Sequence, residues 1–86
     1  MSSEQATLIR NKIIGVLLRQ ARLRAGKSVE QCARALDCEP AFISQAETGA
    51  QALTLPQLET LAHLLDVSVS HLIDDGHLAD SLARTG

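Results

Sequence analysis

Closely spaced signals for helix starts and helix ends restrict the fold of this chain more than any other feature. Gly26 can end a first helix, because glycine tolerates left-handed backbone geometry. Ser28 and Gln31 have the three-residue spacing of a capping box, which predicts a short second helix to about residue 36. Pro40 suits the first position of a third helix, and Gly49 marks its end. The stretch 28–47 therefore predicts two short helices joined by a tight turn.

A long helix is expected before this pair, and two further helices after it. Ser2 or Ser3 can cap the first helix, whose apolar residues recur near a period of 3.6: Leu8, Ile9, Ile13, Leu17 and Ala21. Thr54 and Gln57 have the spacing of a second capping box, and Ser68 can cap a last short helix that carries Leu72 and Ile73. No alternating apolar pattern predicts a strand. The sequence therefore predicts an all-α fold.

Composition limits the chain to one small domain. It has 86 residues, of which 45% are apolar, and a single aromatic residue, Phe42, so an aliphatic core is expected. We expect an N-terminal extension of the first helix over 1–11, the domain proper over 12–75 and a tail over 76–86. No apolar run is long enough to span a bilayer, and the N-terminus lacks the pattern of a signal peptide. A soluble, cytoplasmic protein that does not bind membranes is expected.

The cysteines and histidines do not form a recognisable metal or catalytic pattern. Cys32 falls on an apolar stripe and Cys38 in the following turn, so both are interpreted as small core residues rather than as a disulfide. The three histidines, at 63, 71 and 77, have no Cys-x-x-Cys motif to complete a metal site. No glycine-rich phosphate loop or nucleophile with a paired base is present. We therefore expect no metal, no cofactor and no enzymatic activity.

The order and spacing of these residues resemble the Cro and phage-repressor type of helix-turn-helix domain, the XRE family. The residues that carry the resemblance are Ile14-Gly15, Leu18-Arg19, Arg22, Gly26, Ser28, Ala33, Leu36, Ile43-Ser44, Glu47, Gly49, Leu58, Leu61-Ala62, Leu65, Val67 and Leu72. The resemblance implies a five-helix, lambda-repressor-like DNA-binding domain with its motif at about 28–47. It also implies an ion pair between Arg22 and Glu47.

The resemblance implies that the chain reads double-stranded DNA with the helix at about 40–47 in the major groove. The matching positions give four base-facing residues: Pro40, Ala41, Phe42 and Gln45. Gln45 could pair with adenine, although an ordinary solvated side chain is the alternative. The phosphate-facing positions would be Lys27, Ser28, Val29, Ser44, Thr48 and Gln51.

Charge is distributed unevenly along the chain. Residues 1–34 carry a net +5, whereas residues 35–86 carry a net −7. The expected recognition helix and the loop after it contain no lysine or arginine. Asp37 and Glu39 add carboxylates where the family commonly has glycine and serine. Because phosphate neutralisation supplies most non-specific affinity, a monomer should bind DNA weakly.

Two functions remain open. The first is a sequence-specific transcriptional regulator that binds a two-fold operator as a homodimer. Its dimer surface would consist of apolar residues near the two ends of the chain: Val69, Leu72, Ile73, Leu78 and Leu82, with Leu8 and Ile9. These residues could instead simply close the core. The second function is a protein-interaction module that meets a protein partner through Ala41, Phe42, Ala50, Ala52 and Leu53.

Overall fold

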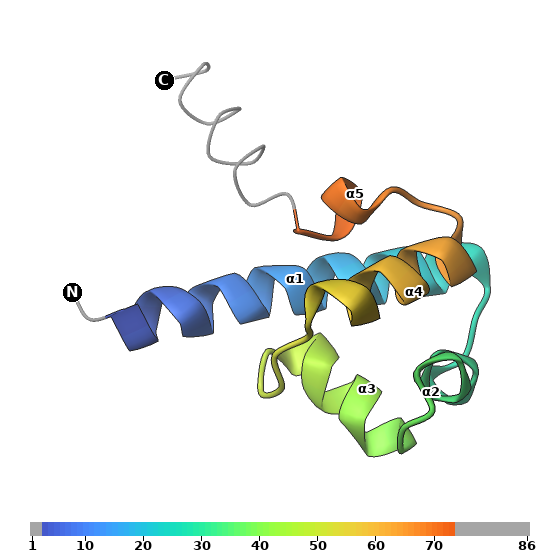
Figure 1. The fold of residues 1–86 in the computed structure, drawn as a ribbon, viewed down its shortest axis with the longest axis horizontal. Coiled ribbons are helices and arrows are strands. Elements are labelled where there is room, and N and C mark those ends of the chain that lie inside the picture. Colours follow the sequence, from blue (N-terminus) through green and yellow to red (C-terminus); the bar gives the residue numbers. More distant parts are fainter. Residues whose placement is uncertain (1–2, 74–86) are drawn as a thin grey trace.

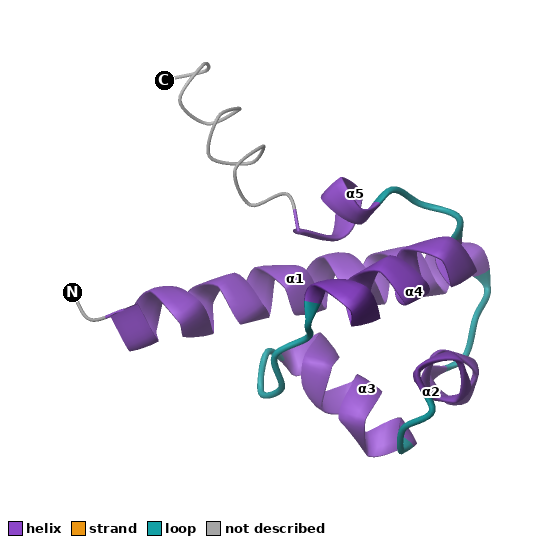
Figure 2. Ribbon diagram, viewed as in Figure 1, coloured by secondary structure: helices purple, strands orange, loops and turns teal. Residues whose placement is uncertain are grey.

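The computed structural model describes the backbone of residues 3–73 and the side chains from Leu8 onwards. Five helices make up this part of the chain, and it contains no strand (Figures 1 and 2): α1 (Ser3–Ala25), α2 (Val29–Leu36), α3 (Pro40–Thr48), α4 (Leu55–Leu65) and α5 (Val69–Ile73). The prediction of an all-α, five-helix fold is confirmed. In Figure 1, the long helix α1 crosses the molecule, with α2 and α3 on one side and α5 on the other. α1 contacts α3, α4 and α5, while α2 packs against α3 and α4.

Local capping chemistry sets the starts of α2 and α4. The Gln31 amide donates to Ser28 Oγ at 3.0 Å, and the Ser28 amide donates to Gln31 Oε1 at 2.8 Å. Thr54 and Gln57 repeat this arrangement at the start of α4, with distances of 3.3 and 2.8 Å. Both predicted capping boxes are confirmed. Each satisfies two backbone amides that a helix start would otherwise leave unpaired.

The core is aliphatic and lies between all five helices. Its fully buried side chains are Leu18, Cys32, Ile43, Leu61 and Leu72. Cys32 is therefore a core residue as predicted, and the half-buried Cys38 packs against the same cluster. Burial raises the pKa of both thiols above the ordinary value of 9.0, because removal from water disfavours the charged thiolate.

The alternative that Leu8 and Ile9 close the core is wrong. Their side chains are 55% and 54% exposed, and the face of α1 that enters the core carries Gly15, Leu18 and Ala21. The physical reason is that α1 has apolar residues on opposite faces, and a period of 3.6 cannot tell which face the other helices cover.

The expectation that Leu72 belongs to a dimer surface is wrong. Its side chain is completely buried, so it closes the core and cannot form part of a dimer surface. Val69 and Ile73 are half-buried and pack against the same core. Leu78 and Leu82 lie outside the described residues, as do Ser2, the histidine at 77 and the tail over 76–86.

Two glycines allow the backbone of α1 to meet the end of α3. A Cβ atom on Gly15 would lie 2.4 Å from the carbonyl oxygen of Ala46 and 2.6 Å from that of Glu47. Gly49, with a φ of +86°, follows α3, and a Cβ there would lie 2.6 Å from Lys12 Cγ. Neither position has room for a side chain. The two glycines therefore determine how closely α1 and α3 can approach each other.

Candidate nucleic-acid interface

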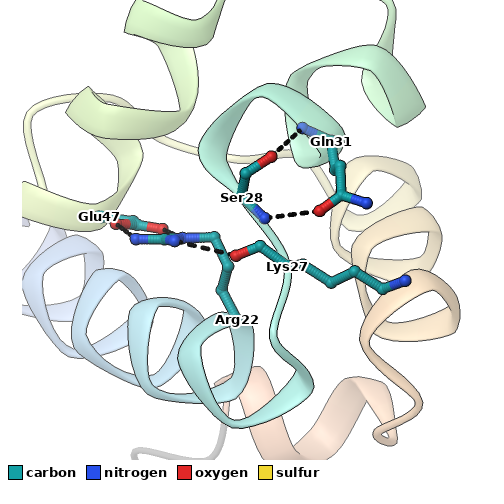
Figure 3. A network of polar contacts seen from close by, with 5 residues as sticks. All are labelled: Arg22, Lys27, Ser28, Gln31 and Glu47. Carbon is teal, nitrogen blue, oxygen red and sulfur yellow. Dashed lines mark hydrogen bonds and ion pairs between the residues drawn. The ribbon is translucent and has the colours of Figure 1, made fainter.

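A two-point ion pair joins α1 to the end of α3 (Figure 3). Arg22 Nε donates to Glu47 Oε2 at 2.5 Å, and Arg22 Nη2 donates to Glu47 Oε1 at 3.1 Å. The two side chains are only 11% and 8% exposed. The hydrogen bonds that Arg22 donates to Glu47 raise the pKa of Arg22 above its ordinary value, so the guanidinium stays charged despite burial.

The same guanidinium also holds the turn before α2. Arg22 Nη1 donates to the carbonyl oxygen of Lys27 at 3.1 Å, one residue before the Ser28 cap. Three segments of the domain therefore meet at the Arg22 side chain: α1, the turn before α2 and the end of α3. Because all of these donors point inward, the geometry favours a structural role for Arg22 over a phosphate contact.

The outer face of α3 presents four of the expected DNA-contacting residues. Pro40, Ala41, Ser44 and Gln45 are exposed on it. Phe42 differs from the other base-facing candidates, because its ring is half-buried and packs against the core. An exposed face beside a helix N-terminus is the arrangement that a major-groove reader needs.

Several expected phosphate contacts already use their side chains within the domain. Ser28 Oγ is engaged in the capping box, Thr48 Oγ1 donates to the Gln45 carbonyl at 2.9 Å, and Gln51 Nε2 donates to the Ala52 carbonyl at 3.0 Å. The Lys27 side chain extends away from the ion pair in Figure 3 and lines a hollow with Arg24, Asp66 and His71. Backbone amides at the start of α2 and the exposed Ser44 hydroxyl are therefore the better candidates for phosphate contacts.

Lys12 is a candidate contact that the sequence did not point to. It is exposed on α1, and its Cα and Cγ lie against Gly49 at the end of α3. This position brings a cation next to a helix and loop whose own sequence, 40–54, has none. The two residues are far apart along the chain, so their proximity becomes visible only when α1 is packed on α3.

Two carboxylates flank the entrance to α3. Asp37 caps the end of α2 in left-handed geometry, with φ 55° and ψ 48°. Glu39 precedes Pro40 as the N-cap of α3, and its side chain makes no capping hydrogen bond. Both are exposed, so any phosphate that approaches this turn meets two negative charges.

A sequence profile of the helix-turn-helix domain matches residues 13–72. This match covers well over half of the 86 residues, and the chain belongs to the helix-turn-helix domain family. Its helix order, caps and buried Arg22–Glu47 pair agree with the Cro and phage-repressor type within that family.

Two solved structures share the fold. One is described as a hypothetical transcription factor, NHTF, from Neisseria, with 23% identity, a TM-score of 0.67 and coverage of 74% of each chain. The other is an HTH_3 family transcriptional regulator from Vibrio cholerae, with 25% identity and a TM-score of 0.71. That likeness covers 84% of the present chain but 41% of the Vibrio chain. No curated protein matches the sequence.

The family assignment makes the chain a binding domain and not an enzyme. Among the residues that the structure describes, no three histidine, cysteine or acidic side chains gather where they could hold a metal ion. No helix in the same part of the chain combines the length and apolar character that crossing a membrane requires.

Proposed function

We propose that this chain is a sequence-specific DNA-binding transcriptional regulator whose α3 lies in the major groove. The observation that carries the proposal is the exposed face of α3, with Ala41, Ser44 and Gln45, held in a fixed orientation by the buried Arg22–Glu47 pair. Membership in the helix-turn-helix family and likeness to two structures described as transcription factors or regulators support it.

Each exposed residue of α3 has a distinct part in this proposal. Gln45 pairs with adenine N6 and N7, and Ala41 contacts a thymine methyl group. Ser44 and the backbone amides of Val29 and Glu30 bind phosphates and set the register of α3 in the groove. Lys12 adds a cation beside the loop after α3.

Homodimerisation on a two-fold operator is the second element of the proposal. One short helix with a single amide reader cannot distinguish a site among about 10⁶ competing genomic sites, whereas two copies spaced about 34 Å apart double the contacts. The half-buried Val69 and Ile73, together with Leu78 and Leu82 outside the described residues, form the proposed dimer surface. Val69 and Ile73, like Leu8, are not completely buried in the described core.

Selection of bound sequences from random DNA at low salt tests the proposal. We expect enrichment of a two-fold motif with half-sites one helical turn apart. Ala41→Asp is the matched negative control: the position is exposed, and an acidic residue suits the first turn of a helix, but the carboxylate repels DNA. No enrichment by the parent chain, with the domain folded, would contradict DNA reading.

A protein-interaction module is the second candidate, and the charge of this face favours it. Ala41, Ala50 and Ala52 are exposed, with the half-buried Phe42 and Leu53 beside them, on a surface whose sequence has no cation. Under this alternative, Ala41→Asp abolishes capture of a protein partner while the random-DNA selection stays empty for both variants.

A further inference from the structure

The outer face of α1 carries an apolar seam that the rest of the described domain leaves uncovered. We define the α1 seam as Ile9, Ile13, Val16, Gln20 and Leu23, which follow one another at alternating steps of four and three residues. This is the spacing of a coiled-coil contact line, in which apolar residues repeat every 3.5 residues on average. The polar Gln20 occupies one core position of the repeat.

Exposure shows that most of the α1 seam lies outside the core, although Ile13 is half-buried. Ile9, Val16 and Leu23 are 54%, 52% and 58% exposed, although the opposite face of α1 packs Gly15, Leu18 and Ala21 into the core. Ile13, Val16 and Leu17 with the stem of Lys12 line a shallow hollow of about 230 Å³. In Figure 1 the N-terminal half of α1 projects beyond the other helices, so the α1 seam begins outside the bundle.

Charge identifies the kind of partner. The basic residues that flank the α1 seam at coiled-coil edge positions include Lys12 and Arg19 on one side and Arg24 on the other. Between residues 5 and 25, α1 has no acidic residue at all. A second α1 docked here would place cations against cations, whereas edge positions select partners by complementary charge.

We propose that the α1 seam is a docking site for an amphipathic helix of another protein, with apolar residues at its contact positions and glutamate or aspartate at its edges. Gln20 fixes the register by pairing with a polar side chain of that helix.

Binding of two designed peptides to the full chain tests this proposal. Both are three-heptad helices with isoleucine and leucine at the contact positions and one asparagine opposite Gln20. One carries glutamate at every edge position, and the other carries lysine. By fluorescence anisotropy at low salt, we expect the glutamate peptide to saturate in the micromolar range and the lysine peptide to bind at least about tenfold more weakly. Added salt should weaken the glutamate complex, since its edge pairs are exposed.

Two substitutions assign the binding to the α1 seam. Val16→Glu should abolish binding of the glutamate peptide, and the position is exposed, so circular dichroism should show an unchanged fold. His63→Glu is the control, because it also adds a carboxylate at an exposed position but lies within α4. No saturable binding by the parent chain, or equal binding by Val16→Glu, overturns the proposal.

Other occupants give distinct results. A homodimer that Val16→Glu dissociates and His63→Glu leaves intact would assign the α1 seam to a second copy and overturn the acidic partner. Peptide binding that appears only after Asp74, Asp75 and Asp80 are replaced by asparagine would assign the α1 seam to the chain's own C-terminal segment, with the same consequence. Neither result depends on whether the domain binds DNA.

Discussion

In the proposed function, Gln45 is the residue on which base recognition by α3 depends most. It is exposed on the outer face, and no other amide or charged side chain with donors stands on that face. Gln45→Ala should weaken binding to the selected operator by about 1–3 kcal/mol, with the loss concentrated at one base pair per half-site. Gln20→Ala, the same change at an exposed position of α1, should leave the affinity unchanged. Equal affinity of parent and Gln45→Ala would remove Gln45 from the interface.

The two carboxylates at the entrance to α3 should weaken contact with any DNA. Asp37→Gly and Glu39→Gln should each tighten binding to every sequence at low salt without changing specificity, because each removes a charge near phosphates and adds no base contact. Competition binding against specific and random duplexes measures both effects.

Asp66 supplies a matched control for Asp37. It ends α4 in nearly the same left-handed conformation, φ 58° against 55°, and is also an exposed carboxylate at a helix C-terminus. Both aspartate-to-glycine substitutions should stabilise the fold by about 0.5–1 kcal/mol, since glycine suits this conformation and the negative end of a helix disfavours a carboxylate. Only Asp37→Gly should change DNA affinity. A similar gain for Asp66→Gly would show that stability, and not charge at the groove, is responsible.

At the scale of elements, the crossing of α1 and α3 depends on the absence of a side chain at Gly15. Gly15→Ala would place a methyl group 2.4 Å from the Ala46 carbonyl oxygen, so the helices must separate. We expect a loss of about 1–3 kcal/mol or more in the free energy of unfolding measured in urea. Gly26→Ala is the control: a Cβ there has open space, and the cost of about 1–2 kcal/mol comes from its φ of +69° alone. The two variants should differ in DNA binding, because only Gly15→Ala shifts α3.

The Arg22–Glu47 pair should behave as a coupled unit. Replacing either partner alone, as Arg22→Met or Glu47→Leu, should cost about 3–5 kcal/mol, because a charge is left unpaired in a site that is about nine-tenths buried. The double variant should lose much less than the sum of the two. Urea unfolding of all four chains completes the cycle, and simple additivity would mean that the pair contributes no coupling.

The elements show where sequence is informative and where it is not. Helix starts at Ser28 and Thr54 could be predicted because a capping box is a local interaction within four residues. The face of α1 that enters the core could not, since Ile9 and Leu18 both fit a helical period and tertiary packing decides between them. The contact of Lys12 with Gly49 could not be predicted from the sequence either, because it exists only once two helices that are distant in sequence cross.

At the scale of the whole molecule, charge and size together predict that a single copy of the chain binds DNA too weakly to recognise an operator. The chain has a net charge of −2 and a recognition helix without cations, so its affinity for DNA has to come from duplicated contacts. Sedimentation at micromolar concentration should show a homodimer, or a dimer that forms on operator DNA. Leu78→Glu with Leu82→Glu should reduce both dimerisation and operator affinity, whereas His63→Glu, at an exposed position of α4, should affect neither. A strict monomer that binds its operator with one copy would contradict the dimer.

The contacts at Gly15 and Gly49 have a consequence for how such a domain can change its target. The orientation of α3 is set by the close contacts at Gly15 and Gly49 and by one buried ion pair. None of these groups belongs to the outward face of α3. Ala41, Ser44 and Gln45 can therefore be exchanged for other residues while the helix keeps its place. If α3 reads DNA as proposed, substitutions at these three exposed positions should change the operator that is bound without changing the fold.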